Sequence, residues 1–229
     1  TIGSTTQLAS TTTGGTWSTS NVTVATISGG GVVSGVGPGT VTITYTLPTG
    51  CIATKLITVN PNPAAIGGAS TVCVASSTTL TNATSGGTWT SSNSLWATVV
   101  SGTGVVTGVG AGVPTITYTL PTGCIATFPI TVNPLPASIA GPSTMCTGTT
   151  TTLSNATTGG AWSSSDLVVA TIGSTTGLVN ALTAGTVVMS YTLPTGCYTT
   201  LQMTINIQPA AITGASSVCN GFTTTLSNA

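Results

Sequence analysis

Charged side chains are almost absent from this sequence. Its 229 residues contain one lysine, Lys55, and one aspartate, Asp166, with no arginine, glutamate or histidine, whereas about a quarter of an ordinary soluble domain is charged. Acid–base catalysis and metal binding draw mainly on histidine and carboxylates, and nucleic-acid binding needs clustered lysine and arginine. We therefore expect no enzyme, no cofactor or metal site, and no nucleic-acid partner.

Long apolar runs and helical periodicity are missing as well. A membrane-spanning helix needs about 18 or more consecutive apolar residues, and the sequence has no such run, so membrane insertion is not expected. The chain nevertheless has 40% hydrophobic residues and no net charge, unlike a disordered segment, which combines low hydrophobicity with high charge. Threonine and valine dominate between closely spaced glycines and prolines, which predicts an all-β protein.

The sequence is a tandem repeat with a period of 73 residues. The heptapeptide Tyr-Thr-Leu-Pro-Thr-Gly-Cys occurs at residues 45–51, 118–124 and 191–197. Before the second copy, threonine alternates with apolar residues, as in a strand with one buried face, and its proline and glycine favour a tight turn. The block therefore predicts a strand, a turn and a second strand in every repeat.

Short proline-containing joints divide the repeats from one another and favour stiff, extended linkers. About seven short strands fit into each period of about 73 residues, which is typical of an antiparallel β-sandwich. We predict that the first repeat lacks its first strand and that the last part of the sequence supplies only the first strands of a further repeat. The predicted boundaries are 1–60, 61–133, 134–206 and 207–229.

Three tryptophans recur at one repeat position, shortly after a pair of glycines. They are Trp17, Trp89 and Trp162, and each is predicted to fill the core between the two sheets of its repeat. Trp96 stands where the other repeats have Val24 and Val169. We interpret it as a larger core residue in one copy and not as a ligand-binding tryptophan.

A fixed order of short motifs runs through all three repeats. In the third it reads Trp-Ser-Ser-Ser-Asp at 162–166, Val-Ala-Thr at 169–171, Thr-Gly-Leu-Val at 176–179 and Ala-Gly-Thr at 184–186. This order resembles bacterial Ig-like domains of the group 2 type, which implies tandem seven-stranded Ig-like antiparallel β-sandwiches. The cysteines and proline joints are also similar to repeats in giant surface proteins of Bacteroidetes-type bacteria. Such families imply a secreted or cell-surface array.

Six cysteines form two series that keep the same period. The members are Cys51, Cys124 and Cys197 in one series and Cys73, Cys146 and Cys219 in the other. Regularly spaced cysteines in small β-domains, without zinc-type spacing, indicate disulfides and an oxidising compartment. Thr1 occupies the position at which later repeats carry their first cysteine, so the partners of Cys51 and Cys219 are expected outside the segment.

The pairing of these cysteines stays open. Bonds within a repeat, Cys73–Cys124 and Cys146–Cys197, would join residues 51 apart. Each pair would stand at opposite ends of a strand of roughly eight residues, or about 26 Å, whereas bonded cysteines have Cα atoms less than about 7 Å apart. The difficulty disappears if the cysteines lie further into their strands. A bond across a junction, Cys73–Cys197, other pairings and free thiols are the alternatives.

Three asparagines fit the Asn-x-Thr acceptor pattern for N-glycosylation. They are Asn21, Asn82 and Asn155, and the last two share one repeat position, which duplication alone explains. Lys55 has no equivalent in the other repeats and is interpreted as a surface variant. Asp166 aligns with asparagines in the other repeats, which indicates a turn stabilised by the side chain.

A surface without charges predicts self-association. Proteins of zero net charge tend to associate, and the edge strands have proline but almost no lysine to block pairing with other strands. We expect other copies of the chain as partners in an extracellular or cell-surface fibre, stalk or array.

Donation of a strand from residues 207–219 to the next copy is one route to such a fibre. The alternatives are an adhesin that binds surface glycans, and ice binding by the threonine ladder at residues 40–46. No leader is visible, and we expect that it has been removed or lies outside the segment.

Overall fold

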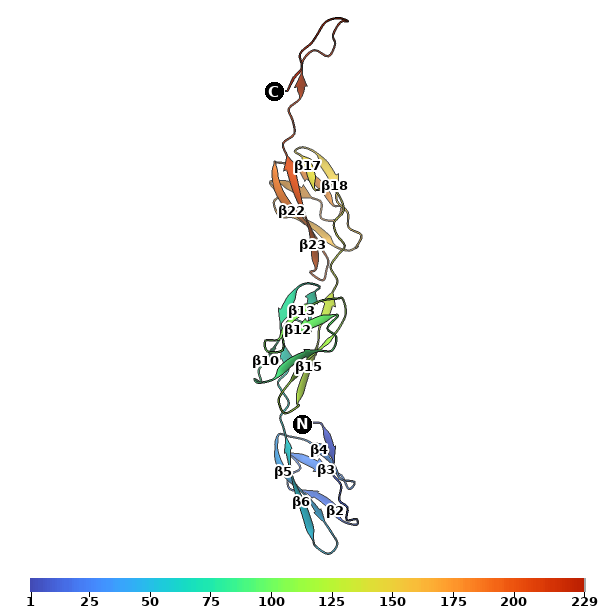
Figure 1. Ribbon diagram of the computed structural model, residues 1–229, viewed down its shortest axis with the longest axis vertical. Helices are drawn as coiled ribbons and strands as arrows, with labels where there is room; N and C mark the ends of the chain where they lie inside the picture. The colour runs from blue at the N-terminus through green and yellow to red at the C-terminus, as the bar shows by residue number, and fades with distance from the viewer. Residues whose placement is uncertain (229) are drawn as a thin grey trace. The chain divides into compact units, whose positions relative to one another are not determined.

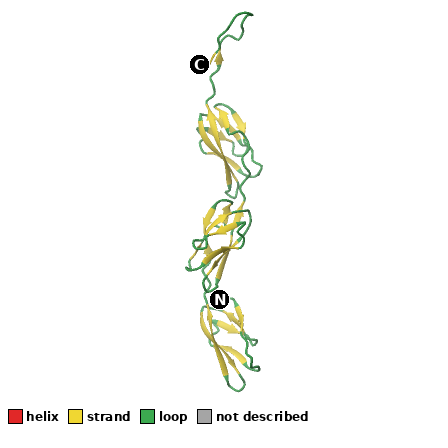
Figure 2. Cartoon of the chain, viewed as in Figure 1, coloured by secondary structure: helices red, strands yellow, loops and turns green. Residues whose placement is uncertain are grey.

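The computed structural model describes residues 1–228, and all the regular elements in this range are β-strands (Figure 2). Contacts divide the chain into two compact units, Thr1–Asn133 and Pro134–Ala229. Among the described residues, no helix is long and apolar enough to cross a membrane. The all-β prediction is confirmed.

The unit that begins at Pro134 contains a seven-stranded β-sandwich (Figure 1). Its strands are β17 (Thr144–Cys146), β18 (Thr150–Thr152), β19 (Ala161–Ser164), β20 (Ala170–Ile172), β21 (Leu178–Ala181), β22 (Gly185–Thr192) and β23 (Tyr198–Asn206). One sheet has the order β17-β23-β22-β19 and the other the order β18-β21-β20. Neighbouring strands run antiparallel, except that β17 and β23 pair in parallel.

Strand β22 shows how the sequence pattern builds the core of this sandwich. Val187, Met189 and Tyr191 are buried, whereas the residues between them stay partly accessible. This alternation follows from the period of two in a strand, which sends successive side chains to opposite faces. Buried residues from both sheets join in one apolar cluster.

Residues 61–133, in the other unit, form a second sandwich. Its strands are β7 (Ile66–Gly67), β8 (Thr71–Cys73), β9 (Ser77–Thr79), β10 (Thr81–Asn82), β11 (Thr88–Ser91), β12 (Ala97–Val99), β13 (Val105–Gly108), β14 (Thr115–Thr119), β15 (Ile125–Pro129) and β16 (Thr131–Asn133). The main sheets have the orders β11-β14-β15 and β12-β13-β9. Strands β8 and β16 pair in parallel, as β17 and β23 do.

The last strands of these two repeats differ in one place. Strand β15 ends at Pro129 and β16 begins at Thr131, whereas β23 runs unbroken through Gln202 at the same repeat position. At the break, the Ile130 N–H donates to the Pro114 carbonyl at 3.0 Å, but Pro114 has no backbone N–H with which to return the bond. Proline at this position of the neighbouring strand, where the third repeat has Val187, therefore interrupts the ladder without changing the path of the chain.

Residues 1–60 form a smaller sandwich with a separate apolar cluster. Its strands are β1 (Thr5–Gln7), β2 (Thr16–Thr19), β3 (Ala25–Ile27), β4 (Val32–Gly35), β5 (Gly39–Thr46) and β6 (Ile52–Val59). The sheets have the orders β1-β4-β3 and β2-β5-β6. At the other end of the sequence, β24 (Ile212–Thr213) and β25 (Ser227–Asn228) pair antiparallel, and both are exposed. The repeat boundaries themselves stay a prediction.

Each sandwich has a tryptophan packed against a tyrosine of the adjacent strand. The ring centroids of Trp89 and Tyr118 lie 4.7 Å apart and their planes are tilted by 51°, and the other two repeats have the same pair. Trp89 and Trp162 are 5% and 7% exposed and belong to the core clusters, as predicted. Trp17 packs against its cluster but is only half-buried.

The tyrosine hydroxyl fastens a loop to this aromatic pair. Tyr118 Oη donates to the Thr84 carbonyl at 2.7 Å and accepts from the Gly87 N–H at 2.8 Å. Tyr45 and Tyr191 make the equivalent bonds. A Cβ at Gly87 would lie 2.5 Å from the Tyr118 ring, which explains why a glycine precedes each tryptophan by two residues.

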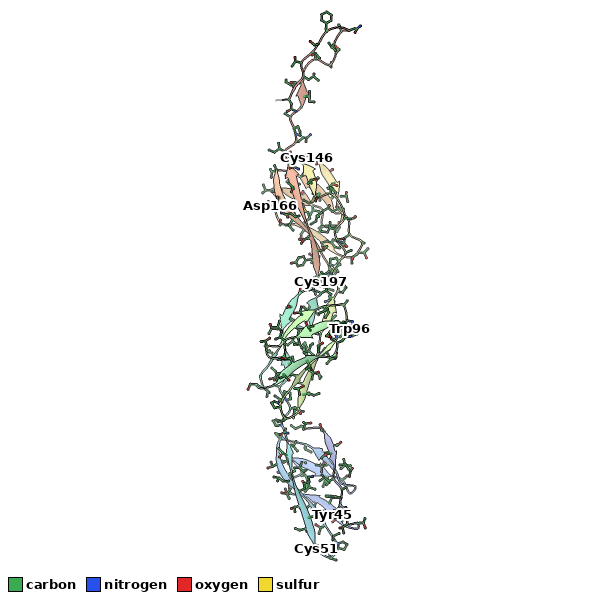
Figure 3. All side chains as sticks on the ribbon, in the orientation of Figure 1. Tyr45, Cys51, Trp96, Cys146, Asp166 and Cys197 are labelled. Atoms are coloured by element: carbon green, nitrogen blue, oxygen red, sulfur yellow. The ribbon has the colours of Figure 1, made fainter. Side chains whose placement is uncertain are left out.

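Trp96 is not the core residue that the alignment with Val24 and Val169 predicts. Its side chain is 40% exposed, at the end of the turn before β12 (Figure 3). The indole covers Gly112, where an added Cβ would collide with the ring. An indole is too large for the small space that the valines occupy, so it lies over the edge of the sandwich.

The hydroxyl of Tyr118 gives a first test of this account. We expect Tyr118→Phe to lower the unfolding free energy by ~1–3 kcal/mol, because the Gly87 N–H and Thr84 carbonyl lose a partly buried partner. Urea titration followed by tryptophan fluorescence measures this change. Tyr198, which is 58% exposed, is the control, and an equal loss in Tyr198→Phe would contradict the account.

Candidate functional site

The cysteines fall into two chemical states. Cys73 and Cys197 are disulfide-bonded, whereas Cys51, Cys124, Cys146 and Cys219 are free thiols. The pairs expected within a repeat, Cys73–Cys124 and Cys146–Cys197, are therefore not formed. Cys51 and Cys219 are exposed and Cys124 is buried.

The strand geometry explains why the pairs within a repeat fail. Cys146 lies opposite Asn206, the last residue of β23, whereas Cys197 directly precedes the first. Strand β23 has nine residues, so it separates the two cysteines by about 30 Å, and Figure 3 shows them at opposite ends of the repeat. Cys73 likewise lies opposite Asn133, whereas Cys124 precedes β15. The cysteines do not lie further into their strands.

Two of the three predicted glycosylation sites, Asn82 and Asn155, make hydrogen bonds within the fold. The Asn82 side-chain amide donates to the Ala64 carbonyl at 2.6 Å, and its Oδ1 accepts from the Thr84 N–H at 2.9 Å. Asn155 makes the equivalent bonds to Ala137 and Thr157. A sugar on either amide nitrogen would have to displace this bond. Glycosylation at Asn21, which is exposed, stays a prediction.

The two charged side chains lie on the surface of different repeats. Lys55 is exposed on β6. Asp166 lies in a turn, where its Oδ1 accepts from the Val168 N–H at 2.8 Å, as predicted from its alignment with asparagines. Among residues 1–228, no group of three or more histidine, cysteine, aspartate or glutamate side chains could hold a metal ion.

An exposed apolar ledge recurs on every repeat. It consists of the turn before β3, β12 or β20 and the loop after β4, β13 or β21. The members are Val22 and Val36 in the first repeat, Leu95, Trp96, Val109 and Val113 in the second, and Leu167, Val168 and Leu182 in the third. Backbone bonds hold the turn and loop together, such as the one from the Val109 N–H to the Trp96 carbonyl at 2.8 Å.

The ledge was missed in the sequence because its residues fit no strand pattern. Leu95, for example, lies in a turn and not in a strand, because its N–H donates to Asn93 Oδ1 at 2.9 Å. Its side chain is 76% exposed. The signal available was the recurrence of large apolar residues within two positions after the Asn or Asp of each turn. A second set of exposed residues, one in each repeat, is formed by the first residues of β6, β15 and β23, which are Ile52, Ile125 and Tyr198.

One stretch of the sequence matches the model of a known protein family. Residues 52–124 match the bacterial Ig-like domain (group 2) family. The matched stretch is one repeat long and confirms the resemblance drawn from the motif order. Together with the disulfide-bonded cysteines, this match points to an extracellular or surface protein.

Solved structures that match the chain share little of its sequence. Invasin, a bacterial integrin-binding protein, is 18% identical with a TM-score of 0.43, and the match covers 89% of this chain and 54% of invasin. The surface layer protein SbsC, domains 1–6, is 16% identical with a TM-score of 0.31, covering 88% and 36% respectively. Drosophila N-cadherin EC1-3 is 13% identical with a TM-score of 0.29, covering 89% and 92%.

The chain thus spans about a third of the SbsC structure and about half of the invasin structure. Likeness at this level carries no conclusion about activity. No curated protein matches the sequence.

Substitution of Asn82 tests its structural role. We expect Asn82→Ala to lower the unfolding free energy by ~1–3 kcal/mol, because the Ala64 carbonyl and Thr84 N–H lose their partner. The control is Asn21→Ala, since Asn21 is exposed and its Oδ1 bonds lie within one turn. Thermal unfolding by circular dichroism gives both values, and the assignment fails if Asn21→Ala is the more damaging change.

Proposed function

We propose that this chain is a structural repeat segment of an extracellular bacterial fibre, stalk or surface array. Its partners are other copies of itself, which associate through uncharged sandwich surfaces. The observation that carries the proposal is the apolar ledge, because it recurs at one position on every repeat. Several equivalent ledges on one chain can bind the ledges of a second copy, and the overall affinity then exceeds that of a single contact because the sites are linked.

The composition removes the usual obstacle to such association. Soluble proteins avoid joining edge to edge by placing charges, especially lysine, on edges and faces. Here Lys55 is the one basic side chain in 229 residues. The ledges of the first two repeats therefore meet with no like-charge repulsion and no buried ion to desolvate, and the third ledge has one charge, on Asp166 in its turn.

Salt and pH should have little influence on this association. Salt acts by screening charges, and pH acts through groups that titrate, whereas Lys55 and Asp166 are single exposed residues on different repeats. A material built in this way keeps its contacts across the range of conditions outside a cell.

Sedimentation of the full chain at low and high salt tests the proposal. We expect association at both, and we expect Leu95→Lys combined with Leu167→Lys to weaken it at least tenfold, because lysines on the ledges would have to be desolvated in the contact. The matched control is Thr103→Lys combined with Thr175→Lys, which places the same two charges on exposed turns. A monodisperse monomer of the unaltered chain in low salt would overturn the proposal.

Strand donation is a second route by which copies can join. In the second and third repeats, Val72 and Met145 are buried at the centre of β8 and β17. In the first repeat, Val33, Ile57 and Val59 line the corresponding place, which is a hollow. Val218 is the matching residue of the last segment and is 52% exposed, so its strand has the right pattern to fill the hollow of another copy.

Electron microscopy of assembled material separates the two routes. If strands are donated, we expect Val218→Lys to shorten the assemblies severalfold, because a lysine cannot be buried among Val33, Ile57 and Val59. Ser217→Lys is the control, since Thr71 at that repeat position is exposed. Equal lengths for both variants would exclude donation, whereas ledge variants should change lateral association.

A further inference from the structure

A small hollow lies beside the aromatic pair of the second repeat, and we call it the indole hollow. It has a volume of about 340 Å³, and its lining includes the rings of Trp89 and Tyr118 and the loop at residues 85–87. The first repeat has a hollow of about 400 Å³ at the same repeat position, beside Trp17 and Tyr45. Small-molecule sites in proteins begin at about 300 Å³, so both hollows are large enough for a small ligand.

The indole of Trp89 has an unused hydrogen-bond donor. Among residues 1–228, its N–H donates to no other group, and no buried side-chain nitrogen in that range lacks a partner. The N–H therefore reaches solvent, although the side chain is only 5% exposed. A tryptophan N–H donates and never accepts, and it usually has a partner where the ring is buried. The donor of Trp89 is thus available to a ligand.

A glycine in the adjoining turn leaves this edge of the indole uncovered. A Cβ at Gly104 would lie 3.1 Å from Trp89 Nε1 and 2.9 Å from Cε2. Gly102, two residues earlier, lines the indole hollow, which places the N–H at the rim of the hollow. In the third repeat, a Cβ at Gly177 would lie 3.2 Å from the same two atoms of Trp162. The sequence therefore keeps this edge of the indole free in more than one repeat.

Hydrogen bonds fix another wall of the indole hollow, the loop at residues 85–87. Tyr118 Oη accepts from the Gly87 N–H and donates to the Thr84 carbonyl. Asn82 Oδ1 accepts from the Thr84 N–H. Ser85 lies between these fixed points and is exposed, and its hydroxyl can donate and accept. A site that is formed before its ligand arrives loses little conformational entropy on binding.

The lack of charge decides which class of ligand fits. Lys55 and Asp166 are the only charged side chains, and neither belongs to the second repeat. An ionised ligand would lose its water in the indole hollow without gaining a partner of opposite charge. Aromatic surface next to an N–H and a hydroxyl instead matches a sugar ring, which has apolar C–H groups on its faces and hydroxyls at its edge.

We propose that the indole hollow binds one neutral sugar residue, with the Trp89 N–H donating to a sugar oxygen. This activity goes beyond the proposed self-association, because the indole hollow shares no residue with the apolar ledge of the same repeat. The equivalent hollow beside Trp17 gives the chain a second, linked site, so that weak binding of single sugars adds up on a surface that displays many of them.

NMR spectra of the isotope-labelled chain test the proposal. The chain contains Leu95→Lys and Leu167→Lys, so that self-association does not affect the result. The probes are glucose, galactose, mannose and N-acetylglucosamine, each alone, with glucuronate as the charged counterpart of glucose. We expect at least one neutral sugar to shift the indole N–H resonances of Trp17 and Trp89 in a saturable way, and we expect glucuronate to shift neither.

Trp96 is the internal control, because its indole is 40% exposed on the ledge and lies outside the indole hollow. Its resonance should not move. A shift of Trp96 alone, or no saturable shift of Trp17 and Trp89 with any of the four neutral sugars, overturns the proposal. Tighter binding of a neutral polysaccharide than of its monosaccharide, per sugar residue, assigns a glycan as the source of the sugar, and equal binding assigns a free sugar.

A bulky residue in the loop tests the position of the site. Ser85 is exposed and lines the indole hollow, so we expect Ser85→Trp to weaken sugar binding at Trp89 at least about tenfold by steric exclusion. Ser76→Trp is the matched control, since Ser76 is exposed and stands at the other end of β9 from the hollow. Equal affinities in the two variants would contradict the assigned site.

Discussion

All three sandwiches hold their sheets together without ion pairs. Lys55 and Asp166 belong to different repeats, and no buried side-chain nitrogen or oxygen among the described residues lacks a hydrogen bond. Stability therefore depends on apolar packing and on bonds that join loops to the core. The tyrosine hydroxyl is central to this arrangement, because it fixes the loop that carries the glycine before each tryptophan. Because the interior is stabilised in this way, the fold does not depend on charged side chains at its surface.

Much of the fold can be predicted from the sequence because its signals are local and repeated. Alternation of threonine with apolar residues predicts β5, β14 and β22, and the turn block predicts the strand that follows each of them. The buried positions of Trp89 and Trp162 follow from their recurrence near a glycine pair. Trp96 shows the limit of this reasoning, since alignment with two valines ignores the volume that the position can hold.

The candidate sites were less accessible to sequence reasoning because they depend on contacts between distant residues. The places of Cys73 and Cys146 follow from the parallel register of β8 with β16 and of β17 with β23. A sequence period shows that two cysteines recur but not which end of a sandwich each occupies. Likewise, Asn82 fits a glycosylation pattern, and only the structure shows that Ala64 already accepts a hydrogen bond from its amide.

The parallel pairing of β8 with β16 has a mechanical consequence. One strand lies near the start of its repeat and the other at its end, and they are direct neighbours. If an external force stretches the chain, the two strands are drawn along their length in opposite directions. Their hydrogen bonds then resist in shear and must rupture together, instead of opening one at a time like a zipper. The two repeats that contain such a pair, β8 with β16 and β17 with β23, thus resist tension along the chain through bonds loaded in shear.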